Sequence, residues 1–139
     1  MESSVYTTLK NTEKVCLQCH KLDDYNHYII EAISTVGEKV AYTTFRIKEH
    51  NTCCLMKIEI INPSYAHQGL GTKMLIFMEY LASKQYCSKI DGKFYPFGDL
   101  GEFAREFYTK NGYRIIKEYY DTEIFKRIDN VNMEIKNTI

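Results

Sequence analysis

The hydrophobic period of the chain changes at Pro63, and this change limits the folds that the sequence can adopt. Before Pro63, runs of β-branched and aromatic residues are separated by short turn-forming stretches, which is typical of an antiparallel meander. After it, apolar residues recur at the spacing of one helix face, at Leu70, Met74, Phe77, Met78 and Leu81. A strand therefore leads into a helix through the segment YAHQGLG (65–71), which contains two glycines.

The remaining pattern predicts an α+β domain. A strand with a terminal loop follows the first helix, then a second helix in DLGEFAREFYTKNG (99–112), and finally a hairpin around the turn at Asp121 and Thr122. The order of elements favours a mixed, mostly antiparallel twisted sheet flanked by helices. A length of 139 residues suits one domain, spanning 1–139. The expected strands cover 14–22, 27–35, 39–47, 52–61, 88–98, 113–120 and 123–128.

The second helix carries signals at both ends. Asp99 and Glu102 have the spacing of a capping box, and Gly112 suits a left-handed C-terminal cap. Apolar residues between these ends recur at helical spacing, so we expect them to form the buried stripe of the helix. They are Leu100, Phe103, Ala104 and Phe107.

Charge and composition exclude several classes of partner. Lys plus Arg equals Asp plus Glu, at 18 each, which gives no reason to expect nucleic acid or an anionic membrane. No apolar run approaches the roughly 20 residues that a membrane-spanning helix needs. The segment MESSVYTTLKNTEK (1–14) lacks the basic and apolar regions of a signal peptide, so we expect a cytoplasmic protein.

The five cysteines include one motif with two interpretations. CLQCH (16–20) fits the C-x-x-C-H pattern of covalent haem attachment, and its cysteine pair fits half of a zinc site. Haem attachment requires export, and no second cysteine pair stands at a useful spacing for zinc. Alternating polar and apolar residues make a half-buried strand with free thiols the favoured interpretation, and we expect no metal site.

The glycines of YAHQGLG have two interpretations as well. A helix that begins at a glycine-rich turn presents amides without intrahelical partners, at the positive end of its dipole, and this suits a phosphate or diphosphate. The alternative is a simple turn with glycines that allow close helix packing. The spacing matches neither the mononucleotide P-loop nor the three-glycine dinucleotide fingerprint.

Two segments carry a resemblance to a known family. IEIINPSYAHQGLGTKMLIFMEYL (58–81) resembles the signature of the Gcn5-related N-acetyltransferase (GNAT) superfamily, a strand followed by Pro-x-Tyr-Arg/Gln-x-x-Gly-x-Gly/Ala and a helix. EFAREFYTKNGYRI (102–115) resembles the family's second element, Ala-x-x-Phe-Tyr-x-x-x-Gly-Phe/Tyr. The resemblance covers 40–127 and implies a GNAT-like fold. The strand-like residues 1–35 indicate that the family's N-terminal helical pair is shortened or absent.

The resemblance implies that acetyl-CoA is the co-substrate. By position, the diphosphate would bind amides of His67, Gln68, Gly69, Leu70, Gly71 and Thr72. The pantetheine arm would pair beside Ile60, Ile61 and Asn62. Two departures remove side-chain contacts: Ala66 replaces the family's Arg or Gln, and Gly101 replaces a frequent coenzyme-contacting Asn.

The resemblance also implies catalytic candidates. Tyr108 occupies the family's Tyr position and would donate a proton to the departing thiolate, whereas the alternative is a tyrosine packed beside Phe107. Glu59 is the candidate base. Because side chains alternate along a strand, we expect Met56, Ile58 and Ile60 on one face of this strand and Glu59 on the other. Its alternative is a solvated or cross-strand-paired glutamate.

The implied function is transfer of an acetyl group from acetyl-CoA to a primary amine by direct attack in a ternary complex. The acceptor would be an amine of a protein, peptide or small molecule, and the missing helices favour an open cleft suited to a peptide or protein. The alternative is a catalytically silent CoA-binding sensor or scaffold. The edge strands and the 12 tyrosines are compatible with a homodimer.

Overall fold

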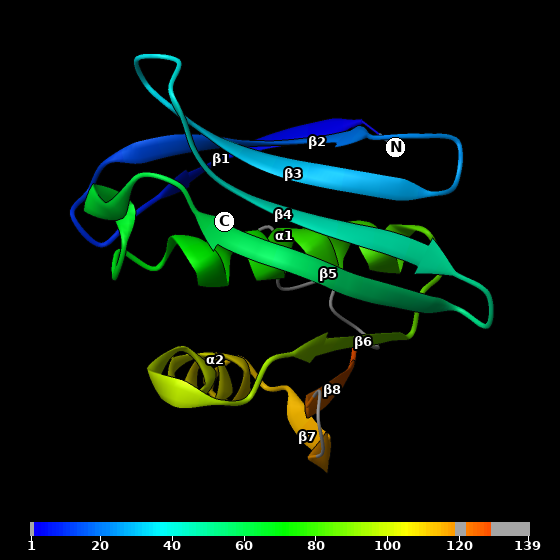
Figure 1. The fold of residues 1–139 in the computed structure, drawn as a ribbon. Helices are drawn as coiled ribbons and strands as arrows, with labels where there is room; N and C mark the ends of the chain where they lie inside the picture. The colour runs from blue at the N-terminus through cyan, green and yellow to red at the C-terminus, as the bar shows by residue number, and fades with distance from the viewer. Residues whose placement is uncertain (1, 119–121, 129–139) are drawn as a thin grey trace.

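The computed structural model describes residues 2–118 and 122–128, and these residues form one sheet with two α-helices (Figure 1). This confirms the expected α+β class. In chain order the elements are β1 (Ser3–Thr8), β2 (Lys14–Lys21), β3 (His27–Ser34), β4 (Lys39–Lys48), β5 (Thr52–Ile60), the 3₁₀ turn η1 (Pro63–Tyr65), α1 (Leu70–Lys84), β6 (Lys89–Phe94), α2 (Gly98–Lys110), β7 (Arg114–Glu118) and β8 (Thr122–Arg127).

The sheet is mixed and mostly antiparallel, as predicted. Its strand order is β1-β2-β3-β4-β5-β6-β8-β7, and β1 to β5 form a continuous antiparallel meander. β8 lies between β6 and β7 and pairs antiparallel with both. The two groups meet at a short parallel pairing of β5 with β6, because α1 crosses from the end of one strand to the start of the other.

The N-terminal region is built from strands. Among the described residues that precede Pro63 there is no helix, so a β1–β2 hairpin stands where the resemblance leads one to expect a helical pair. β1 was not assigned from the sequence. Within β2, burial alternates along the strand as expected for a half-buried element, with Cys19 buried and Cys16 on the other face.

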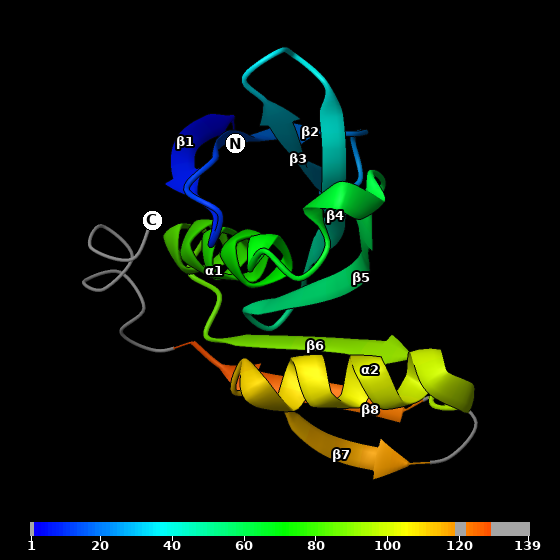
Figure 2. The same ribbon diagram turned by 90° about the vertical axis from the view of Figure 1, so that its left-hand side faces the viewer.

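The first helix packs its buried face against the sheet to form the core. α1 lies in the curve of the meander, as Figure 2 shows, and contacts β3, β4 and β5. The predicted helical stripe of α1 is buried, and its members are Leu70, Met74, Phe77, Met78 and Leu81. They pack against the inward side chains of the strands, such as Leu17, Ile30 and Phe45. No helix among residues 2–118 and 122–128 is long and apolar enough to cross a membrane.

The second helix differs from its prediction in two ways. α2 begins at Gly98 with Phe97 at the N-cap and has no side-chain capping bond, so the capping box of Asp99 and Glu102 is wrong. The predicted buried stripe is half right. Ala104 and Phe107 are partly buried against the core, but Leu100 is 85% exposed and Phe103 56% exposed, and the helix buries Gly101 and Tyr108 instead. Gly112 does adopt the expected left-handed conformation, with φ +87°.

A β-bulge changes the faces of β5. The β4–β5 register shifts between Thr44 and Phe45, which pair with Lys57 and Leu55, so Met56 has no cross-strand partner. Met56 is 52% exposed and does not share the face of Ile58, contrary to expectation. In the closing hairpin, Thr122 belongs to β8, while Asp121 of the predicted turn lies outside the described residues.

Candidate functional site

The parallel pairing of β5 with β6 is short, and the two strands separate beyond it. Their register runs from Thr52↔Lys89 to Leu55↔Gly92 and then stops. A Cβ atom on Gly92 would lie 2.9 Å from the Leu55 carbonyl oxygen, so glycine permits the close contact at this apex. Beyond the apex, β5 continues to Ile60 paired with β4, which leaves its other edge facing an opening of about 850 Å³.

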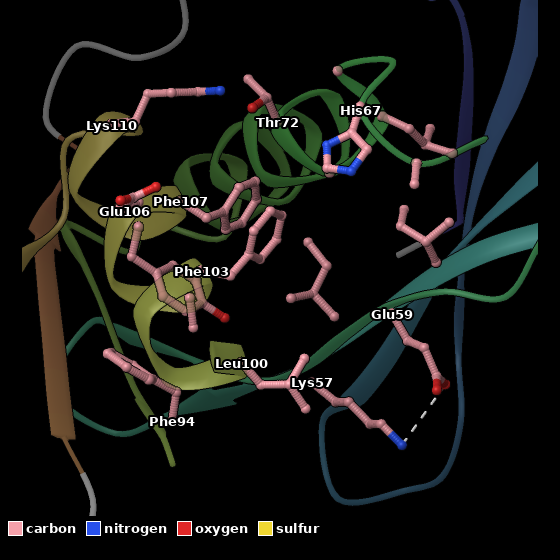
Figure 3. A pocket seen from close by; sticks show the side chains of 18 of the residues that line it. Lys57, Glu59, His67, Thr72, Phe94, Leu100, Phe103, Glu106, Phe107 and Lys110 are labelled. Carbon is pink, nitrogen blue, oxygen red and sulfur yellow. Dashed lines mark ion pairs between the residues drawn. The ribbon is translucent and has the colours of Figure 1, made fainter. Parts of the chain in front are cut away.

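Three elements form the walls of this pocket (Figure 3). The open edge of β5 forms one wall, the start of α1 a second and the apolar face of α2 a third. In Figure 3 the side chains of Phe103 and Phe107 extend from α2 into the space that faces α1 and the loop before it. The exposed part of the stripe, Leu100 and Phe103, therefore lines the pocket, whereas Phe107 lines the pocket and also packs against the core.

The first turn of α1 has amides that no side chain caps. Its N-cap residue, Gly69, is in the left-handed conformation at φ +82°, and the first intrahelical bond runs from the Lys73 amide to the Gly69 carbonyl. The amides of Leu70, Gly71 and Thr72 therefore precede the helical ladder. All three residues line the pocket, where the positive end of the helix dipole favours an anion.

The turn-and-packing interpretation of the glycines is confirmed by two different residues, and the anion site stays a prediction. Gly69 is needed for its backbone conformation at the N-cap. Gly71 is needed for packing, because a Cβ atom there would lie 3.1 Å from the Phe107 ring of α2. The two helices thus approach one another through Gly71 and Phe107 at the pocket's inner wall.

The predicted coenzyme-binding residues separate into two groups. Ile61, Asn62 and Gln68 do not line the pocket, and the amides of Ile61 and Asn62 donate to the Val40 carbonyl at 2.8 and 3.1 Å. These two amides are engaged within the protein and are not available to a ligand. The predicted residues that line the pocket are Ile60, His67, Gly69, Leu70, Gly71 and Thr72; their role in binding stays a prediction.

The engaged Ile61 amide also fixes which amides of β5 face the pocket. In an antiparallel pair, alternate residues direct their amides to the partner strand and to the opposite side. Since the Ile61 amide faces β4, those of Ile60 and Ile58 face the open edge. The open edge of β5 therefore offers the amides of Ile58 and Ile60, whereas the sequence indicated the segment from Ile60 to Asn62.

Tyr108 lines the pocket and is 6% exposed. The rings of Phe94, Phe107 and Tyr113 surround it, with centroids 5.3 to 5.8 Å from its own. Burial raises the pKa of Tyr108 to about 12, so its phenol keeps its proton at neutral pH. The protonated phenol can therefore act as a donor, and burial raises the free energy of the phenolate that remains once the proton has left.

Glu59 lies at the pocket edge beside Lys57. Their side chains approach to 3.8 Å between Lys57 Nζ and Glu59 Oε2, and both are largely exposed (Figure 3). The hydrogen bond to Tyr42 and the charge of Glu59 raise the pKa of Lys57. Glu59 is therefore exposed and paired with a lysine of its own strand, which is close to the alternative of a solvated or cross-strand-paired glutamate. Its role as base stays a prediction.

Sequence reasoning missed several residues of the site. Lys10 reaches the pocket from the β1–β2 turn, and its distance in sequence from the glycine loop concealed it. The exposed stripe of α2 was found but assigned to the core. Gly101 was read as a lost contact, but a Cβ atom there would lie 2.2 Å from the Pro96 carbonyl carbon, so the fold itself leaves no room for a side chain.

Comparison with known proteins identifies the fold. No family model and no curated protein matches the sequence. Among solved structures, a GNAT-family acetyltransferase from Staphylococcus aureus is 18% identical and has a TM-score of 0.67, over 76% of this chain and 70% of that one. The GNAT domain of PAT from S. lividans is 7% identical with a TM-score of 0.74, over 89% and 96%. PaiA N-acetyltransferase from Thermoplasma acidophilum, solved with coenzyme A, is 17% identical with a TM-score of 0.64, over 73% and 61%.

Proposed function

We propose that this protein, which has the fold of the GNAT acetyltransferases, is an N-acetyltransferase that moves an acetyl group from acetyl-CoA to a primary amine. The observation that carries the proposal is the continuity of one wall of the pocket. The open edge of β5 ends at Ile60, and a short loop leads from it to the uncapped amides of α1. An extended chain that ends in a diphosphate is complementary to such a wall.

The walls fit the parts of acetyl-CoA in order. The amides of Leu70, Gly71 and Thr72 can hold the diphosphate, and the amides of Ile58 and Ile60 can pair with the pantetheine arm as an added strand would. The exposed apolar stripe of α2 then gains a partner, because a bound coenzyme covers Leu100 and Phe103. This last point is independent of the backbone amides.

Residues that line the pocket supply the chemistry. The amine nitrogen forms a bond to the thioester carbonyl carbon, the carbon–sulfur bond breaks, and the amine loses a proton while the sulfur gains one. An amide on the β5 edge can polarise the carbonyl oxygen. The Tyr108 phenol donates its proton to the departing sulfur and is reprotonated from solvent, while Glu59 or a water molecule accepts the proton that the amine loses.

The acceptor approaches from a side that the protein leaves open. No helix among the described residues before Pro63 covers the sheet. This supports a peptide or protein amine, which brings its own bulk, over a small molecule that needs enclosure.

A second candidate function is binding of CoA without catalysis. The Glu59 carboxylate is paired with Lys57, and Tyr108 is almost completely buried, so neither candidate catalytic group is free of its neighbours. A CoA-dependent sensor or scaffold needs the amides of α1 and the edge of β5 but neither of these side chains.

Thermal denaturation with acetyl-CoA, followed by release of free thiol against a panel of amines, separates the two candidates. The proposed function predicts a rise in Tm with coenzyme concentration and thiol release with at least one amine or peptide. Stabilisation without thiol release for any acceptor supports the sensor. No stabilisation at millimolar acetyl-CoA contradicts both.

A further inference from the structure

The β1–β2 turn is fixed against the loop that precedes α1. The Lys10 amide donates to the Gln68 carbonyl at 3.0 Å. The Tyr65 hydroxyl donates to Glu13 Oε1 at 2.5 Å, a contact between residues 52 positions apart. These two bonds tie residues 10–13 to both ends of the loop 65–68, so the β1–β2 hairpin positions the start of α1.

The Lys10 side chain continues over the N-terminus of α1. Its Cε lies 3.6 Å from the position that a Cβ atom on Gly69 would occupy, and the residue lines the pocket. Of the carboxylates in the described part of the chain, none forms an ion pair with Lys10. The three carboxylates that line the pocket belong to β5 and α2: Glu59, Asp99 and Glu106.

Without an anion this placement is slightly unfavourable, because the exposed Lys10 side chain brings a screened positive charge near the helix N-terminus. The N-terminus of a helix is the positive end of its dipole, so a cation beside it is disfavoured and an anion is favoured. The Lys10 side chain nevertheless passes beside Gly69, the N-cap residue, and it lines the same pocket as Leu70, Gly71 and Thr72. A bound anion would be attracted by the helix N-terminus and by the Lys10 ammonium, and would offset the repulsion between these two positive groups.

We propose that Lys10 is a binding residue for the diphosphate of the coenzyme. The β1–β2 turn of the same chain would bring it to the glycine loop. The inference rests on the proposed function. It replaces the side-chain contact that Ala66 lacks, since Lys10 reaches the same loop from a segment 56 positions earlier (66 minus 10). The contact is charge-assisted and therefore stronger than a hydrogen bond between neutral groups.

The test uses calorimetric titration of CoA and of dephospho-CoA, which lacks the 3′-phosphate but keeps the diphosphate. The main variant is Lys10→Gln, which removes the charge and keeps most of the aliphatic stem; Lys10→Arg restores a charge. Lys14→Gln is the matched control, because Lys14 is an exposed lysine of the same hairpin that does not line the pocket. We expect Lys10→Gln to raise Kd by roughly tenfold for both ligands, with Lys10→Arg and Lys14→Gln within about threefold of wild type.

The outcomes distinguish this inference from the proposed function. If wild-type protein does not bind CoA, both are overturned. If wild type binds and Lys10→Gln binds equally well, only the role of Lys10 is overturned. A loss that disappears with dephospho-CoA rejects the diphosphate as the partner of Lys10, and an equal loss in Lys14→Gln rejects a specific contact. Thermal unfolding of each variant, compared with wild type, shows that it is folded.

Discussion

The two helices place their apolar residues in opposite environments. α1 buries its stripe, including Phe77 and Met78, which have no exposed surface, against the curved meander. α2 instead presents Leu100 and Phe103 to the pocket. The difference indicates separate roles: α1 holds the sheet together and offers only its first turn to a ligand, whereas α2 contributes a wall that a ligand completes. Substitutions in α1 should therefore cost stability, and those in the stripe of α2 should cost binding.

The largest effect is expected from Phe77→Ala in α1. Removing a completely buried aromatic ring leaves a cavity, so the free energy of unfolding should fall by about 3–5 kcal/mol. Urea denaturation followed by circular dichroism measures this change. A loss below about 1 kcal/mol would contradict the scaffold role of α1, because it would mean that the helix packs loosely.

Tyr108→Phe tests the one residue of α2 that is both buried and part of the pocket. Without the hydroxyl donor, kcat should fall by roughly 100-fold, while the Kd for CoA changes little. Release of free thiol with the acceptor found in the amine screen measures kcat.

The pH profile adds a control for this variant. Burial holds the pKa of Tyr108 at about 12, above the ordinary value of 10, so the phenol stays protonated well into the alkaline range. The ratio of wild-type to variant kcat should therefore stay constant from about pH 7 to 10. An unchanged kcat would remove Tyr108 from the mechanism.

A smaller effect is expected from Phe103→Ser in the exposed stripe. The side chain is 56% exposed in the free protein, so the free energy of unfolding should change by no more than about 0.5 kcal/mol. The Kd for CoA should rise by roughly tenfold, because the coenzyme loses the apolar surface that it covers. The opposite pattern, lost stability with unchanged Kd, would show that the stripe belongs to the core after all.

The contrast between the helices also explains what the sequence predicted well. Hydrophobic periodicity located both helices and the strands from β2 onward, because it reports whether a stretch of chain suits a helix or a strand. It does not report what covers an apolar face. Leu100 and Phe103 follow the same period as Met74 and Phe77, yet one pair faces a pocket and the other the core.

Other features were not predictable because they depend on distant contacts. The bulge at Met56 follows from the register with β4, and the short extent of the β5–β6 pairing fixes which amides are open. The contact of Lys10 with Gln68 joins the first hairpin to the glycine loop and has no local signal. The uncapped turn of α1 was predictable, since its glycines and its helix are adjacent in sequence.

The most direct test of the account is a crystal structure of the protein with CoA. The account predicts a diphosphate within hydrogen-bond distance of the amides of Leu70, Gly71 and Thr72, and a pantetheine arm beside Ile58 and Ile60. A coenzyme bound elsewhere, with the open edge of β5 and the first turn of α1 free of ligand, would contradict it.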